Sequence, residues 1–215
     1  MNKPVKSKIK RIPDRAVYDR EAIYHILDRE RFCHVGIIYN QYPVVIPTLF
    51  GRKGDDLYIH GASVSRLITE LEKKIDVCIS VANISGFVLA RSAFHHSMNY
   101  ESVVIFGKGE LVPGPDKEDA LKIISNHILP GRWEEVRPPN RKELKATKVM
   151  KIHIEEISAK VRSGGPKDEK ADMDLDIWAG ILPVIRNYGT PLADPQMNTA
   201  IPVPDSIENL LKQSS

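Results

Sequence analysis

The stretch Leu57-Tyr58-Ile59-His60-Gly61-Ala62-Ser63-Val64-Ser65-Arg66-Leu67 decides the fold predicted for this chain. It begins as a strand, because apolar residues follow the turn-forming Gly54-Asp55-Asp56 and predict a strand over 57–60. It ends as a helix, because apolar residues recur at helical spacing as far as Ile75. We therefore expect a strand, a turn of small residues and a helix over 63–74.

The turn itself carries groups that suit a phosphate. Two hydroxyls, Ser63 and Ser65, and the cation Arg66 lie where the helix would begin. A helix N-terminus offers unpaired backbone N–H groups and a partial positive charge. Hydroxyls add further hydrogen-bond donors, and a guanidinium adds both donors and positive charge, so that a phosphate could bind. The alternative is structural: Ser63 would be an ordinary N-cap and Arg66 a solvated side chain of the first turn.

Upstream of this stretch, the sequence predicts a helix and a hairpin. Asp19 precedes apolar residues at helical spacing and would cap a helix that follows it. Residues 32–39 and 42–50 read as two strands joined by a two-residue turn. Pro43 and Pro47 cannot donate ladder hydrogen bonds, so they place the second strand at an edge of the sheet or in a bulge.

Downstream, long strands alternate with short helices. We expect strands over 76–84, 100–112 and 149–161, and helices that open at Pro115-Asp116 and at Arg141. The apolar phase of the last strand changes at Glu155-Glu156, which predicts a β-bulge. The regular crossover helices and glycine-rich turn of a doubly wound fold are missing. The sequence thus predicts a mainly β fold with inserted helices, a six-stranded antiparallel split β-barrel.

Composition narrows the functional class. The 215 residues are 42% hydrophobic and carry a net charge of +3, with bases and acids interleaved, which does not suggest a nucleic-acid partner. No apolar run is long enough to cross a membrane, and the basic N-terminus lacks the apolar segment of a signal peptide. Cys33 and Cys78 have no disulfide or metal spacing and read as buried thiols. We expect a cytoplasmic protein.

Six ordered stretches resemble the flavin-binding split barrel of the pyridoxamine 5'-phosphate oxidase superfamily, and its nitroimidazole-reductase-like branch most. They are His34-Val35-Gly36, Val45-Ile46-Pro47-Thr48, Leu57-Tyr58-Ile59-His60-Gly61, Ser65-Arg66, Ser97-Met98-Asn99-Tyr100-Glu101-Ser102-Val103 and Asp176-Ile177-Trp178-Ala179-Gly180. The resemblance implies an FMN-binding barrel, which we place over 19–182. The sequence on either side predicts a flexible arm over 1–18 and a proline-rich extension over 183–215.

The resemblance also implies a homodimer with FMN at the subunit interface. Main chain at Val45, Ile46, Pro47 and Thr48 would line the edge of the isoalloxazine ring. Tyr58 and His60 would lie beneath the ring and ribityl chain, and Ser65 and Arg66 would bind the phosphate. Asn99, Tyr100 and Ser102 would contact the flavin from the interface strand. Trp178, late in the chain, would lie near the cofactor. The flavin would supply the chemistry, so no catalytic residue and no metal site is predicted.

One departure bears on activity. The oxidase that names the family ends with an Arg-Leu-His pattern that holds its substrate, whereas this chain reads Trp178-Ala179-Gly180-Ile181-Leu182-Pro183. Oxidation of pyridoxamine phosphate is therefore not expected. The sequence favours an FMN-dependent oxidoreductase that reduces a small organic acceptor such as a nitroaromatic compound. A flavin carrier or sensor without turnover, and a haem-binding relative, are the alternatives.

Three further motifs have ordinary explanations. His95-His96 invites a metal or haem interpretation, but adjacent side chains on an extended segment point to opposite faces. Ser163-Gly164-Gly165-Pro166 lacks the Lys-Ser/Thr pair of a phosphate loop. The acidic run 168–176 lacks the glycine and terminal glutamate of a calcium loop and reads as a solvated face or a lid.

Overall fold

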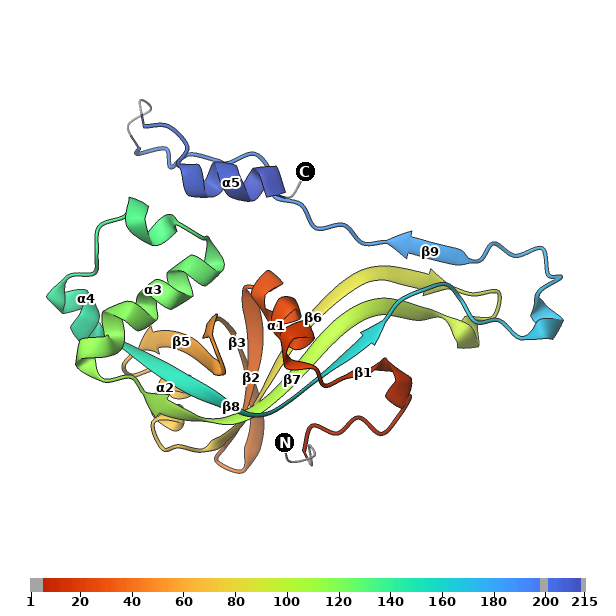
Figure 1. Cartoon of the computed structure of the whole chain (residues 1–215), viewed down its shortest axis with the longest axis horizontal. Coiled ribbons are helices and arrows are strands. Elements are labelled where there is room, and N and C mark those ends of the chain that lie inside the picture. The colour runs from red at the N-terminus through yellow and green to blue at the C-terminus, as the bar shows by residue number, and fades with distance from the viewer. Residues whose placement is uncertain (1–5, 198–200, 214–215) are drawn as a thin grey trace.

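The computed structural model of the chain describes residues 6–197 and 201–213. The first five residues of the expected arm, and residues 198–200 and 214–215 of the expected extension, lie outside this part. Within it, one antiparallel sheet forms the centre and short helices cover parts of it (Figure 1). The fold is therefore mainly β with inserted helices, as the sequence predicts.

The sheet has nine strands in the described residues, so the predicted count of six was wrong. The strands are β1 (Ala16–Val17), β2 (Phe32–Tyr39), β3 (Tyr42–Leu49), β4 (Gly51–Lys53), β5 (Asp56–Ala62), β6 (Asp76–Leu89), β7 (Ser97–Leu111), β8 (Thr147–Arg162) and β9 (Gly180–Pro183). The three that the prediction missed are β1, β4 and β9. They are only two to four residues long, which is too short for apolar alternation to show.

The order of neighbours in the sheet is β3-β2-β6-β7-β8-β5-β4, with β1 beside β8 and β9 beside β6. β3 is thus an edge strand, which confirms the prediction made from its two prolines. The sheet curls without closing its hydrogen-bond ladder into a full barrel.

The helices are α1 (Arg20–Arg29), α2 (Arg66–Leu71), α3 (Lys117–Ile128), α4 (Arg141–Ala146) and α5 (Asp205–Gln213). Short 3₁₀ turns are η1 (Pro13–Arg15), η2 (Ala93–His95), η3 (Gly114–Asp116), η4 (Arg132–Glu135) and η5 (Lys170–Asp172). The predicted cap of α1 is confirmed, since the Asp19 carboxylate accepts a hydrogen bond from the Ala22 N–H.

The main core lies inside the curled sheet and against α1. Alternate residues of β2, namely Cys33, Val35 and Ile37, are buried, and Leu57 and Ile59 of β5 meet them from the other side. A second, smaller core fills the space between β5, β8 and α3. The two faces of β5 therefore contact different cores, because successive side chains of a strand point in opposite directions.

The bulge predicted in β8 is present. Phe106 of β7 pairs with Glu156, but the next residue, Gly107, pairs with Ile154, so Glu155 is the extra residue. A Cβ placed on Gly107 would lie 2.2 Å from the backbone oxygen of His153. Glycine is required there because the two strands approach too closely for any side chain at the bend.

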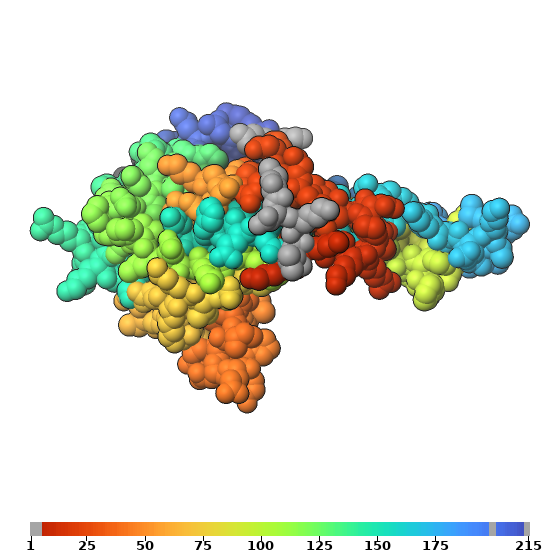
Figure 2. Space-filling view, turned by 60° about the horizontal axis from the view of Figure 1, so that its bottom comes forward, coloured from red at the N-terminus to blue at the C-terminus, as the bar shows by residue number. Residues whose placement is uncertain are grey.

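β6 and β7 form a long hairpin whose turn end projects away from the curled part of the sheet (Figure 1). β9 pairs with the outer end of β6, so the C-terminal segment runs back along the hairpin toward the helices. The space-filling view shows the same arm, and it also shows the turn end of the β2–β3 hairpin, in orange, as a second projection (Figure 2).

The C-terminal segment is attached at its far end as well. Ser206, at the start of α5, donates from its N–H and its hydroxyl to the carboxylate of Glu135 in η4, at 2.9 and 2.5 Å. These bonds hold α5 beside α3 and η4 (Figure 1).

Candidate functional site

The turn after β5 is the centre of the predicted site, and the structure alters its details. α2 begins at Arg66 and not at Ser63, so the predicted helix start was wrong by three residues. Ser65 occupies the N-cap position with an extended backbone, but its side chain makes no capping hydrogen bond. The Ser65 hydroxyl is therefore not engaged at the first turn of α2.

Arg66 carries the positive charge of this turn. Its guanidinium lies over the ring of Tyr39, 4.9 Å from the ring centroid, at the end of β2. It forms no ion pair with a carboxylate in the part of the chain that the structure describes. A guanidinium that rests on an aromatic face and lacks an acidic partner can accept an anion without breaking an existing pair.

Gly61 lets α2 pack close to β5. A Cβ at this position would lie 3.0 Å from a side-chain carbon of Ile68 and 3.3 Å from the Ser65 hydroxyl oxygen. Close approach of the turn to the strand thus depends on glycine. It places the Ser65 hydroxyl directly beside the end of β5.

The four predicted residues of β3 alternate in burial. Val45 and Pro47 are exposed, whereas Ile46 and Thr48 are partly buried and Ile46 packs against the main core. Among the described strands β3 has a hydrogen-bonded neighbour on one side only, so main-chain groups along its other edge remain outside the ladder. Main-chain groups along this edge are available to form hydrogen bonds with the rim of a planar ring.

Tyr58 and His60 lie on the face of β5 that is turned toward α3, opposite Leu57 and Ile59. Tyr58 packs against the second core, and burial raises the pKa of its hydroxyl. His60 lines a pocket with residues of α3, and desolvation lowers the pKa of its imidazole. At neutral pH His60 is therefore uncharged.

The remaining predicted residues belong to the β6–β7 hairpin and the C-terminal segment. Asn99 is buried and accepts a hydrogen bond from Arg162 through its side-chain oxygen, and the Ser102 hydroxyl donates to the Lys160 carbonyl at 3.4 Å. Tyr100 is half-buried, opposite Arg162 in the ladder. The ring of Trp178 is largely exposed and lies against Gly180.

The predicted residues thus form two groups within one chain. The first, on β3, β5 and α2, lies in the curled part of the sheet, and the second lies on the hairpin and the segment beside it. The register places Asn99 near the turn end of the hairpin, which projects away from the curled part (Figure 1). Within the described part of the chain the two groups lie in different parts of the sheet, and their roles remain predictions.

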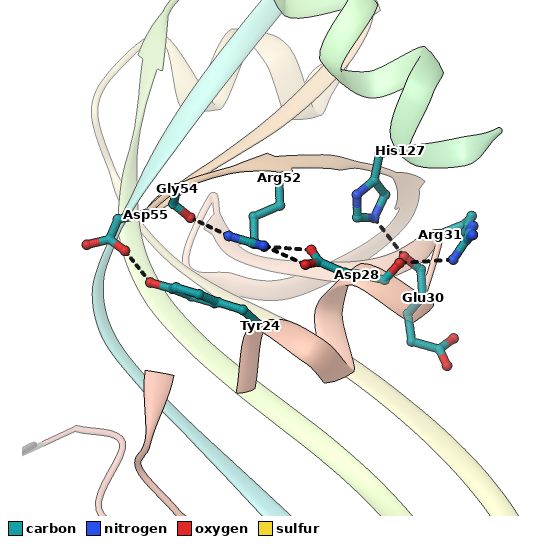
Figure 3. Close-up of polar contacts among 8 residues, drawn as sticks. All are labelled: Tyr24, Asp28, Glu30, Arg31, Arg52, Gly54, Asp55 and His127. Carbon is teal, nitrogen blue, oxygen red and sulfur yellow. Dashed lines mark hydrogen bonds and ion pairs between the residues drawn. The ribbon is translucent and has the colours of Figure 1, made fainter. Parts of the chain in front are cut away.

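A polar network that sequence reasoning missed joins α1, β4 and α3 (Figure 3). Arg52 donates to both carboxylate oxygens of Asp28, at 2.7 and 2.5 Å, and stacks over the ring of Tyr24. The His127 ring N–H donates to the Glu30 carbonyl at 2.8 Å. These residues carried no signal in the sequence, because their partners come from distant elements.

The other motifs behave as structural features. His96 accepts a hydrogen bond from the Ala90 N–H through Nδ1, and His95 lies 3.8 Å from the Glu169 carboxylate. The described residues contain no group of three or more metal-ligating side chains. No helix among them is long and apolar enough to cross a membrane.

Asp168, in the acidic run, is bound to Arg91. The Arg91 guanidinium and its backbone N–H donate to the two carboxylate oxygens at 2.8 and 2.9 Å. Only 2% of the Asp168 side chain is exposed, so at this residue the prediction of a solvated face was wrong.

Comparisons with known proteins agree with this fold. The sequence pattern of the pyridoxamine 5'-phosphate oxidase family matches residues 19–161. A search of curated proteins finds no match.

Three solved structures are informative. The flavocytochrome Anf3 from Azotobacter vinelandii is 37% identical, with a TM-score of 0.89 over 95% of this chain and 96% of that one. The FAD and haem binding protein from Mycobacterium smegmatis is 33% identical, with a TM-score of 0.88 over 91% of this chain and 97% of that one. A structure named for 5-nitroimidazole antibiotic resistance, from Bacteroides thetaiotaomicron, is 28% identical, with a TM-score of 0.58 over 68% of this chain and 86% of that one. The family pattern covers well over half of the sequence, and this chain therefore belongs to the pyridoxamine 5'-phosphate oxidase family, with the split-barrel fold of its members.

Proposed function

We propose that this chain is a redox protein that binds a flavin nucleotide and haem and works as a homodimer. The observation that carries the proposal is Arg66, a guanidinium that has no carboxylate partner among the described residues and follows Ser65 at the start of α2. More than nine-tenths of the chain matches two structures named for these cofactors. The sequence left haem binding as an alternative, and the names of these two similar structures support it.

Arg66 and Ser65 would hold a phosphate of the flavin nucleotide. The exposed edge of β3 at Val45 and Pro47 would lie along the rim of the isoalloxazine ring, through main-chain groups. The sequence resemblance favours FMN, whereas the Mycobacterium smegmatis protein is named for FAD. Both nucleotides carry the ring and a phosphate on the ribityl chain, so this surface suits either, and the mass of the released cofactor identifies it.

The homodimer is supported by apolar side chains on the hairpin. Leu182, Phe87 and Met98 are direct neighbours across β9, β6 and β7, so their side chains share one face of the sheet. All three are large and exposed, at 56, 47 and 44%. A row of this kind on a projecting arm indicates a surface that another subunit covers.

A dimer would also explain why the predicted residues form two groups. The projecting hairpin of one subunit would bring its Asn99, Tyr100 and Trp178 toward the β3–β5 region of the other. We propose that each flavin site combines the two groups in this way.

The cofactors would supply the electron chemistry, since a flavin exchanges one or two electrons and haem iron one. The protein would bind them, orient them and exclude water. Reduction of a small organic acceptor is part of the proposal, and the 28% identity to a structure named for 5-nitroimidazole resistance makes nitroimidazoles the first acceptors to assay.

The test begins with the absorbance spectrum of the purified protein, with FMN, FAD or haemin added if it is colourless. Bands of flavin and haem that survive gel filtration at the elution volume of a dimer are the expected result. The Arg66→Ala variant is expected to weaken flavin binding about 10- to 100-fold, because a hydrogen bond to a charged group contributes about 1.5–3 kcal/mol. Arg11→Ala removes an exposed arginine outside the site and serves as the matched control.

Failure of the wild-type protein to bind either flavin would overturn the proposal. Binding that is equal in Arg66→Ala and Arg11→Ala would retain the flavin and reject the phosphate site. A bound flavin that no acceptor reoxidises would favour the carrier or sensor.

A further inference from the structure

A wide pocket lies between β5, α3 and the segment that leads to α4, and Arg66 is not among its lining residues. Its volume is about 480 Å³, which is within the usual range for small-molecule and cofactor sites. Apolar side chains form most of its wall, among them Leu121 and Ile128 of α3, Trp133 of η4 and Pro139. The composition suits a large, flat, apolar ligand.

One side chain in this wall can ligate a metal without giving up another bond. His60 enters the pocket from β5, and its ring forms no hydrogen bond or ion pair with any residue that the structure describes. The side chain is exposed to solvent in this open pocket, but desolvation by the surrounding atoms lowers the pKa of its imidazole. The neutral ring therefore has a free lone pair at physiological pH. By contrast, the ring of His127 bonds to the Glu30 carbonyl and that of His153 lies 2.8 Å from the Asp56 carboxylate.

A cation lies in the same wall. Arg137 donates to the Glu143 carboxylate at 2.6 and 2.9 Å, and both side chains are largely exposed. An exposed ion pair of this kind is weak and exchanges readily for another carboxylate. The pocket therefore offers three features that suit haem. Its apolar wall could pack against the macrocycle, its neutral histidine could bind the iron, and its guanidinium could pair with a propionate.

We propose that this pocket is the haem site and that His60 is an axial ligand of the iron. The inference rests on the proposed function, since the haem comes from that proposal, but the location comes from this chain's own residues. It also revises the role that the sequence resemblance implied for His60, which was contact with the flavin. Tyr58, two residues earlier on the same face, packs in the second core beneath the pocket.

The test is a titration of the flavin-loaded, full-length protein with haemin, followed by the Soret band. The His60→Ala variant is expected to bind haemin more than about 100-fold more weakly, since loss of even an outer partner of a metal ligand costs 10- to 100-fold. Flavin absorbance is expected to be unchanged. Arg66→Ala is expected to behave in the opposite way, with weaker flavin binding and an unchanged Soret band.

Two controls make the assignment specific. His153→Ala removes an exposed histidine from the neighbouring strand β8 and is expected to leave the Soret band intact. Added imidazole is expected to restore the band in His60→Ala, because a free ligand can occupy the space of the missing side chain. If His60→Ala fails to fold, Leu121→Trp tests the same pocket by filling it and leaving His60 in place.

The outcomes separate the two proposals. Haemin binding that survives both His60→Ala and Leu121→Trp would overturn this location, and loss of the Soret band in His95→Ala would move the ligand to the hairpin. A wild-type protein that binds flavin but no haemin would overturn the inference and leave the flavin proposal standing. A protein that binds neither would overturn both.

Discussion

Arg186, in the C-terminal segment, forms a two-bond ion pair with Glu30 at the end of α1, with nitrogen–oxygen distances of 2.5 and 3.0 Å. The residues are 156 positions apart in the sequence. Only 7% of the Glu30 side chain is exposed, whereas Arg186 reaches it from a largely exposed position. The pair fastens the segment between β9 and α5 to the body of the protein.

Loss of this pair is expected to destabilise the protein. In Arg186→Ala the buried Glu30 carboxylate would lose its guanidinium partner, which we expect to lower the free energy of unfolding by about 1–3 kcal/mol. Urea unfolding followed by circular dichroism measures the change. Lys212→Ala, which breaks an exposed pair with Glu208, is the control and is expected to stay within about 0.5 kcal/mol of the wild type. Equal effects of the two variants would contradict the role of the segment.

The contact between Tyr24 and Asp55 is expected to make stability depend on pH. The hydrogen bond from the Tyr24 hydroxyl, with the nearby Arg20 guanidinium, lowers the pKa of Asp55. A carboxyl whose pKa is lower in the folded state stabilises the protein above its unfolded pKa of about 3.9, and this contribution is lost as the pH falls through the folded pKa.

Tyr24→Phe tests this contribution. At pH 7 the variant is expected to be about 1 kcal/mol less stable than the wild type, and the difference is expected to shrink below about pH 4. Urea unfolding at both pH values measures it. Tyr188→Phe, at an exposed tyrosine, is expected to show no such difference at either pH. If the difference in unfolding free energy between Tyr24→Phe and the wild type grew at low pH, the Tyr24–Asp55 hydrogen bond would not favour the ionised carboxylate.

The apolar row on the hairpin gives a test of the proposed dimer. Phe87→Glu would place a charge in the middle of the row formed with Leu182 and Met98, and burial of that charge in an interface is costly. We expect at least about a tenfold weaker dimer by sedimentation equilibrium, with an unchanged far-ultraviolet spectrum. Leu192→Glu alters a large exposed residue of the C-terminal segment, outside the row and outside the proposed flavin site, and controls for surface charge. A dimer that tolerates Phe87→Glu would place the interface elsewhere.

Local patterns predicted much of the fold. The β2 range, the cap of α1, the edge position of β3 and the bulge in β8 each depend on residues within a few positions of one another, so the sequence carries their signal. Prediction failed where the signal is not local. β1, β4 and β9 are strands only because a longer neighbour pairs with them. α2 begins three residues later than the local pattern predicts, since residues 63–65 form a turn packed close to Gly61 of β5.

The sequence by itself therefore determined the mainly β class, the family resemblance and the Ser65-Arg66 turn, because these depend on side-chain pattern and on short-range turn chemistry. The tertiary structure alone decided which groups meet. It turned His60 toward Trp133 and Leu121, left Arg66 without an acidic partner among the described residues, and separated Asn99 and Trp178 from the rest of the predicted site. Contacts across many positions of the chain depend on strand register and on the path of the C-terminal segment, which no single stretch of sequence specifies.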